Sequence, residues 1–283
     1  MRIPLNNPHK HHQLSPQRHC PLVGWRPARG ANQPFLRVWT LKCIVFSRQI
    51  FVILTVGLSL KKELIKYLSE FITENKRQKI EKVLASRTKY ITVALEDIYQ
   101  PQNASAVVRT CECLGIQEIY VIENKNKYEI NPDVVVGASK WVDIIKFNRY
   151  GERNTTHCIE HLKNKGYRIV ATSPHLDGYT PENVPIDCKL ALLFGTEETG
   201  LTEEAIANAD ITLRIPQYGF TESYNLSVSA AICLYTISKR LRNSSLKWTL
   251  KEEEKLEIQL KWIKKILKRA EILEREFLNR KRG

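Results

Sequence analysis

The sequence predicts an α/β domain with a mostly parallel β-sheet, because strand-like runs alternate with helical segments through the middle of the chain. Five of these runs are short, apolar and rich in β-branched residues, as strands are. They are "YITVALEDI" (90–98), "IQEIYVIE" (116–123), "YRIVATS" (167–173), "KLALLFG" (189–195) and "DITLRIP" (210–216). A strand, a helix and a second strand in this order form a unit whose two strands lie parallel.

Four segments of the same region have apolar residues at helical spacing. They are "NASAVVRTCECLG" (103–115), "HCIEHLKNKG" (157–166), "TEEAIANA" (202–209) and "NLSVSAAICLYTISKRLR" (225–242). The second ends at a glycine, and the third begins with a threonine, a residue type that caps helix N-termini. We therefore expect an α/β domain over residues 90–243.

Helical segments also flank this domain. Residues 60–89 carry apolar side chains at helical spacing on a charged background. Residues 247–283 begin with a capping box of Thr249 and Glu252 and carry one apolar stripe, so we expect a single long basic helix. Residues 1–59 are rich in Pro, His, Arg and Asn and are predicted to be a disordered or non-native extension, dispensable for folding and activity.

The charge of the chain favours a polyanionic partner, and most of this charge lies at the two ends. The chain has 44 Lys and Arg against 30 Asp and Glu, a formal net charge of +14. Residues 1–62 contain ten basic residues and no acid, and residues 247–283 contain twelve basic residues and seven acids. Residues 63–246 are nearly neutral, with 22 basic and 23 acidic residues.

The seven cysteines predict reduced thiols in an intracellular, cytoplasmic protein, because they form no C-x-x-C pair. The pattern His157-x-x-Glu160-His161 resembles a zinc-peptidase motif, but no third ligand in a helical context follows it. We therefore expect no metal. The longest apolar run, "IFVILTVGLSL", has about half the length of a membrane-spanning helix, so no membrane association is expected.

The stretch "LLFGTEETGLT" (192–202) starts like a phosphate-binding loop but does not continue as one. Gly195 and Gly200 have the spacing of a G-x-x-x-x-G-K-[ST] loop, yet Leu201 stands in the place of the lysine. Two of the four residues between the glycines are glutamates, which would repel phosphate groups. A plain strand-to-helix turn is the alternative interpretation.

Three polar segments should meet at one edge of the sheet, because ligands bind outside the carboxyl ends of parallel strands. They are "NASAVVR" (103–109), "GTEETG" (195–200) and "IPQYGFTESYNLS" (215–227), each after an apolar strand. Glycine at position 195 would let the backbone approach a ligand closely. A cavity with two carboxylates and many main-chain donors suits a neutral or cationic nucleoside-like ligand.

These motifs and their order closely resemble the SPOUT class of RNA methyltransferases, in its TrmH-like ribose 2′-O-methyltransferase branch. The resemblance covers roughly residues 75–245, through "NASAVVRTCECLGIQEIYVIE" and "LALLFGTEETGLTEEAIANADITLRIPQYGFTESYNLSVSAAICLY". It implies a parallel-sheet SPOUT fold with a C-terminal trefoil knot, flanked by N- and C-terminal helices. It also implies an S-adenosyl-L-methionine site and a homodimer.

The resemblance assigns roles to individual residues. Asn103 and Arg109 match first-motif residues that serve the target ribose, and Glu197 matches the second-motif glutamate, so these three are the candidate catalytic residues. Because arginine stays protonated at neutral pH, we expect Arg109 to clamp a phosphate and stabilise a developing alkoxide while the proton leaves through phosphate or water. The residues expected to hold the cofactor are Gly195, Ile215, Ser223, Asn225 and Leu226.

The flanking helices favour tRNA as the substrate, because enzymes of the family that methylate the D-loop guanosine (position 18) have such helices. The candidate RNA-binding residues are Lys79, Arg87, Lys239, Arg240 and Arg242. Phe220, Thr221, Glu222 and Tyr224 depart from the Met-Val-Gln and Leu that are usual in the tRNA enzymes. Ribosomal RNA is the alternative substrate, and a non-catalytic RNA-binding protein is the alternative of another class.

Overall fold

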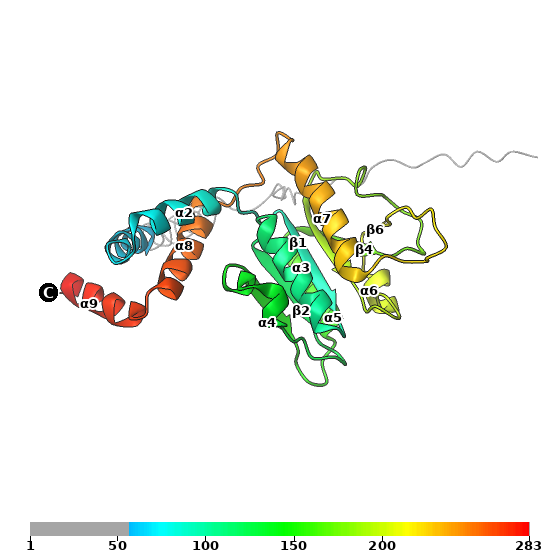
Figure 1. The fold of residues 1–283 in the computed structure, drawn as a ribbon, viewed down its shortest axis with the longest axis horizontal. Coiled ribbons are helices and arrows are strands. Elements are labelled where there is room, and N and C mark those ends of the chain that lie inside the picture. Colours follow the sequence, from blue (N-terminus) through cyan, green and yellow to red (C-terminus); the bar gives the residue numbers. More distant parts are fainter. Residues whose placement is uncertain (1–56, 283) are drawn as a thin grey trace, which may run out of the picture. The chain divides into compact units, whose positions relative to one another are not determined.

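The computed structural model describes residues 57–282, which contain a six-stranded sheet in the order β3-β2-β1-β5-β4-β6 (Figure 1). The strands are β1 (Ile91–Glu96), β2 (Glu118–Ile122), β3 (Asp143–Phe147), β4 (Tyr167–Thr172), β5 (Lys189–Phe194) and β6 (Ile211–Leu213). All neighbouring strands pair in parallel. This confirms the predicted parallel α/β sheet and puts the carboxyl ends of all six strands at one edge.

Helices cover both faces of the sheet, because its central strands are apolar on both sides. Alternate residues of β5, from Leu190 to Phe194, join two different cores. The covering helices are α3 (Pro101–Cys113), α5 (Asn154–Asn164), α6 (Glu203–Ala207) and α7 (Leu226–Arg242). α3 and α7 pack over one core, on the face seen in Figure 1, and α5 and α6 pack over the other.

A third apolar cluster lies among helices from both ends of the described chain. Residues 57–69 are helical, and α2 (Glu74–Ala85), α8 (Glu252–Ile266) and α9 (Ala270–Arg282) join them. Its buried residues are Leu64, Ile65, Leu68, Ile80, Leu84, Leu250, Ile258, Trp262, Ile263 and Phe277. The C-terminal helices therefore complete a core with the N-terminal ones, in addition to carrying charge.

The C-terminal segment forms two helices where the sequence predicts one. The backbone of Leu267 is extended (φ −83°, ψ 119°), which ends α8 before α9 begins. The predicted capping box of Thr249 and Glu252 is also wrong, because Thr249 pairs with Thr88 in an antiparallel bridge. The helix starts later, at Glu252. The backbone N–H of its N-cap residue, Lys251, donates to Glu254 Oε2 (2.9 Å).

Part of the predicted N-terminal extension lies outside the described residues, and the structure contains three elements that were not predicted. The described residues begin at 57, so nearly all of the predicted extension over 1–59 lies outside them. Residues 57–59, which were predicted to belong to that extension, are helical. β3, α4 (Pro132–Val135) and the 3-10 turn η1 (Ala138–Lys140) had no counterpart in the sequence analysis. The trefoil knot stays a prediction. Among residues 57–282, no helix has the length and apolar character needed to cross a membrane.

Candidate active site

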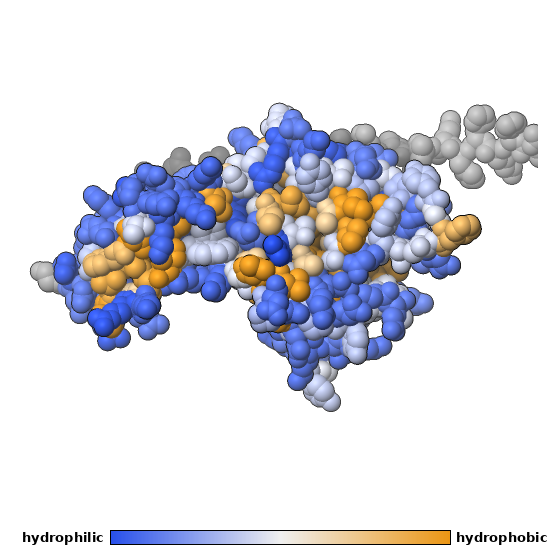
Figure 2. All heavy atoms as spheres, viewed as in Figure 1, coloured by the Kyte–Doolittle hydropathy of each residue, from blue (hydrophilic) through white to orange (hydrophobic). Residues whose placement is uncertain are grey.

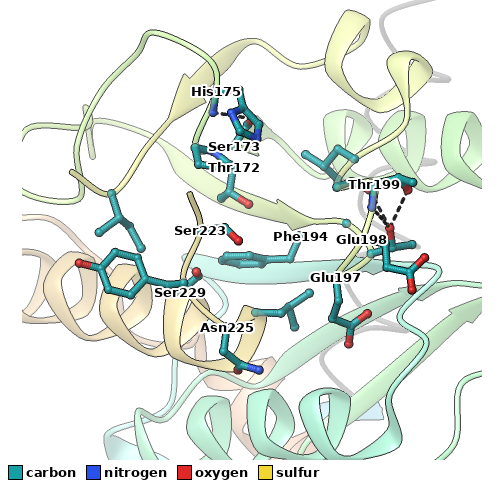
Figure 3. A pocket seen from close by; sticks show the side chains of 18 of the residues that line it. Thr172, Ser173, His175, Phe194, Glu197, Glu198, Thr199, Ser223, Asn225 and Ser229 are labelled. Atoms are coloured by element: carbon teal, nitrogen blue, oxygen red, sulfur yellow. Dashed lines mark hydrogen bonds between the residues drawn. The ribbon is translucent and has the colours of Figure 1, made fainter. Parts of the chain in front are cut away.

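A pocket opens at the edge of the sheet where the strands end (Figure 3). Its volume is about 530 Å³, within the range of pockets that bind small ligands and cofactors. The lining comes from the chain after β1, after β4 and after β5, and from the connection between β6 and α7. The three segments that the sequence predicted at one edge therefore share one cavity.

The turn after β5 closes on itself. Thr196 and Gly200 form an antiparallel bridge through two backbone hydrogen bonds of 3.0 and 3.1 Å. A Cβ atom on Gly195 would lie 2.1 Å from backbone atoms of Gly200. Glycine at position 195 is therefore required because the turn approaches its own backbone, and not only, as predicted, because a ligand approaches it.

Asn103, Glu197 and Asn225 form a chain of hydrogen bonds at one side of the pocket, although they come from three different segments. Asn103 Nδ2 donates to Glu197 Oε1 (2.8 Å), and Asn225 Nδ2 donates to Asn103 Oδ1 (3.1 Å). Asn225 also caps α7, because its Oδ1 accepts the backbone N–H of Ser227 (2.9 Å). Figure 3 shows the side chains of Glu197 and Asn225 on the same side of the cavity. Groups fixed in this way can orient a substrate hydroxyl.

The turn after β5 is anchored by Glu96, a buried carboxylate at the end of β1. Glu96 Oε1 accepts from the hydroxyls of Thr155 (2.6 Å) and Thr202 (2.8 Å), and its Oε2 accepts the backbone N–H of Thr202 (3.0 Å). These bonds hold β1, α5 and the start of α6 together next to the pocket. Glu96 was not among the predicted site residues, although it is the one acid in the largely apolar run "ITVALE".

The chemistry of the lining suits a nucleoside that carries positive charge. Apolar side chains of the wall include those of Phe194, Leu213, Ile215, Leu226 and Cys233. Glu197 and Glu198 supply two carboxylates, and none of the described residues that line the pocket is a lysine or an arginine. All five predicted cofactor-binding residues, including Gly195 and Ser223, belong to this lining.

Comparison with known proteins identifies the family. The model of the SpoU rRNA Methylase family matches residues 90–235, more than half of the chain. The chain belongs to this family. The tRNA (guanosine(18)-2′-O)-methyltransferase of Borreliella burgdorferi is 47% identical over 207 residues, which cover 73% of this chain and 93% of the relative. The enzyme of the same name from Thermus thermophilus is 32% identical over 174 residues, 62% of this chain and 87% of the relative.

A solved structure agrees with this assignment to the SpoU family. The A. aeolicus TrmH/SpoU tRNA modifying enzyme superposes with a TM-score of 0.61 at 29% sequence identity. The match covers 69% of this chain and 98% of the solved chain. The parallel sheet with its covering helices is thus the fold of a SpoU relative, as the motifs indicated.

Arg109 lies apart from the hydrogen-bonded cluster of Asn103, Glu197 and Asn225 in the same chain. It follows Asn103 by six residues on α3 and is exposed, and its Nη1 donates to the carbonyl of Val134 (3.3 Å). It does not belong to the pocket lining among the described residues. The structure therefore brings Asn103 and Glu197 together and leaves Arg109 on the outer surface of α3.

Arg87 is buried, which corrects its prediction as an RNA-binding residue. Its side chain is 1% exposed, and its Nη2 lies 2.7 Å from Glu112 Oε1. Its guanidinium also lies 5.1 Å from the centre of the Trp262 ring on α8. Burial lowers the pKa of the Arg87 guanidinium, and Glu112 offsets part of that effect. Because a phosphate has no access to it, Arg87 joins α8 to α3 instead.

The other four candidate RNA-binding residues are accessible to different degrees. Lys79 and Lys239 are exposed. Arg240 is half-buried and donates to the carbonyl of Pro181 (2.8 Å). Arg242 donates to the carbonyl of Leu114 (2.8 Å), and its guanidinium lies 4.6 Å from the centre of the Trp248 ring. The two lysines are therefore the freer cations of the set.

The histidine motif lies on α5, outside the pocket. The ring of His161 contacts the rings of Tyr120 and Phe147, with centroids 5.7 and 5.6 Å apart. Over residues 57–282, no group of three or more His, Cys, Asp or Glu is arranged to hold a metal ion. Two of the four residues that depart from the tRNA enzymes, Phe220 and Tyr224, are large exposed side chains in the connection between β6 and α7.

Proposed function

We propose that this chain is an S-adenosylmethionine-dependent tRNA ribose 2′-O-methyltransferase that modifies guanosine 18 in the D-loop. The observation that carries the reaction is the bonded set of Asn103, Glu197 and Asn225 beside a pocket without basic lining residues. The substrate is supported by the Borreliella burgdorferi relative, which has this activity in its name and is matched along 93% of its length.

S-adenosylmethionine fits the lining because it is a nucleoside with a positive charge and no phosphate. We assign its adenosine to the apolar wall with Ile215 and Leu226 and to the main chain at Gly195. Ser223 and Asn225 would bind it through their hydroxyl and amide groups. When bound, the cofactor supplies an electrophilic methyl group on a positively charged sulfur.

The chain's own residues would orient the ribose and its hydroxyl. The hydrogen bond between Asn103 and Glu197 fixes the orientation of both side chains. A ribose hydroxyl bonded to them is therefore held in one direction, which lowers the entropic cost of reaching the reactive geometry. Arg109 lies outside the pocket lining of its own chain, so we retain for it the contact with a phosphate of the RNA. The hydroxyl proton leaves to phosphate or water, because arginine stays protonated.

The proposed enzyme is a homodimer that binds tRNA in the cytoplasm. α7 exposes Val228 (45%) and Tyr235 (59%), and Val136 near α3 is 64% exposed. Figure 2 shows apolar side chains gathered on the face that carries α3 and α7. Two copies that pack through this face would remove these side chains from water. Lys79 and Lys239 would hold tRNA phosphates.

Mapping of ribose methylation tests this proposal. The purified full chain is incubated with S-adenosylmethionine and a tRNA transcript, and resistance of each phosphodiester to alkaline hydrolysis is mapped along the RNA. We expect a 2′-O-methyl group at guanosine 18, and none with Asn103→Ala. Modification of ribosomal RNA alone would favour the alternative substrate, and tRNA binding without methyl transfer would favour a non-catalytic RNA-binding protein.

A further inference from the structure

Tyr99 is a large exposed side chain on a rigid piece of backbone between β1 and α3. It is 72% exposed, whereas the two residues before it, Asp97 and Ile98, are 5% and 6% exposed. The carboxylate of Asp97 accepts the backbone N–H groups of Asn124 (2.6 Å) and Lys125 (2.9 Å), which fixes this connection. The Tyr99 side chain has no hydrogen bond or ring contact with the described part of the chain.

Tyr99 is also tied to the proposed catalytic cluster. Its backbone N–H donates to Glu197 Oε2 (3.4 Å), and the other oxygen of this carboxylate accepts from Asn103 (2.8 Å). The next residue, Gln100, lines the pocket and accepts a hydrogen bond from Asn103 Nδ2 (3.2 Å). A substrate group oriented by Asn103 and Glu197 would therefore lie beside Tyr99.

Resting on the function proposed above, we infer that Tyr99 is a stacking surface for the base of the nucleotide whose ribose is methylated. That base is bonded to the ribose that must reach Asn103 and Glu197, so it enters the same region. A base splayed out of an RNA loop loses its stacking neighbours, and an exposed aromatic ring replaces them. Because every base has a π-face, Tyr99 contributes affinity, and the choice of guanosine arises from other contacts.

A second copy of the chain is the competing occupant of this surface. A protein surface seated on Tyr99 would lie next to Glu197, whose Oε2 accepts the Tyr99 backbone N–H, and would narrow the approach of a ribose to the cluster. Tyr235, which is 59% exposed and lies ten residues along α7 from Asn225, offers a protein partner a surface away from the cluster. The observations therefore favour a nucleobase.

The test compares Tyr99→Leu, Tyr99→Phe and Tyr99→Trp with the wild-type chain. We expect Tyr99→Leu to raise the KM and the Kd for tRNA roughly tenfold, within the range for loss of one base–aromatic stack. The kcat and the cofactor affinity should stay within about twofold of wild type, because the reacting atoms are not touched. Phe and Trp at this position should keep wild-type values, because both keep a ring that stacks. Tyr150→Leu is the matched control, since Tyr150 is fully exposed and follows the edge strand β3.

The fluorescence of Tyr99→Trp, taken as the difference from wild type, should be quenched when tRNA binds. Unchanged KM and Kd in Tyr99→Leu, or no quenching, would overturn the inference while methylation at guanosine 18 still supported the proposed function. Loss of self-association by Tyr99→Leu in sedimentation would identify a contact between copies and would also overturn it. Quenching without methylation would instead contradict the proposed function and leave the stacking role supported.

Discussion

Replacing Glu118 with glutamine should destabilise the fold in a way that depends on pH. Glu118 lies on β2 and is 6% exposed. Its carboxylate accepts from Lys165 Nζ (2.8 Å), Tyr120 OH (2.7 Å) and Lys89 Nζ (2.8 Å). Lys89 also lies 3.7 Å from Glu254 of α8, so the network joins the sheet to the C-terminal helices. Glutamine keeps the shape of the side chain and removes its charge.

The size of the effect follows from the pKa of Glu118. Burial opposes its ionisation, but hydrogen bonds from Lys165, Lys89 and Tyr120 outweigh burial and lower the pKa from 4.5 to about 2. At about 1.4 kcal/mol for each pKa unit, this corresponds to about 3 kcal/mol of folding free energy. Because the folded-state pKa is lowered, the stabilisation is complete above pH 4.5 and is lost as the pH falls towards 2. The loss in Glu118→Gln should be about 3 kcal/mol at pH 7 and about half of that at pH 3.

Urea unfolding followed by tryptophan fluorescence measures the free energy of unfolding at both pH values. Glu160→Gln is the control, because it removes an exposed carboxylate from α5 and should change stability by less than about 0.5 kcal/mol. The reasoning would be refuted by a loss in Glu118→Gln that is equal at pH 7 and pH 3, since the destabilisation would then not come from the ion network.

Three further predictions concern the site and its RNA. Gly195→Ala should abolish cofactor binding in calorimetry, because its Cβ would lie 2.1 Å from the backbone of Gly200, whereas Gly219→Ala, with no atom within 4 Å of its Cβ, should bind normally. Arg109→Ala should lose methyl transfer to tRNA and keep the cofactor Kd, and a folded variant that lost cofactor binding would contradict its role at phosphate. The double substitution Lys268→Ala and Arg269→Ala should reduce the log–log salt slope of tRNA binding by about 1.4 to 1.8, and an unchanged slope would exclude both as phosphate contacts.

The sheet and its functional edge could be predicted because their signals are local. β5 is buried on both faces, so its residues form a continuous apolar run, and the polar turn after it marks the end of the strand. The contact between Asn103 and Asn225 could not be predicted in this way, because it joins residues 122 positions apart and depends on the order of the strands. The resemblance to the family singled out both residues without the hydrogen bond that joins them. Glu96 was missed because neither periodicity nor the motifs assign a role to a buried acid at the end of a strand.

Counting charges along the C-terminal segment overstates what is available to RNA, because the fold engages many of its lysines. All four lysines of α8 have partners: Lys255 pairs with Glu252, Lys261 with Asp143 and Lys264 with Glu274, and Lys265 donates to the carbonyl of Lys140. Lys268 and Arg269 are exposed and form no ion pair with the described part of the chain. They lie just after the extended backbone of Leu267, where α8 ends and α9 has not yet begun. The bend that the sequence did not predict therefore presents two exposed cations without an ion pair, between paired lysines on α8 and the paired Lys281 on α9. A phosphate-binding surface is expected at the bend rather than along the whole segment.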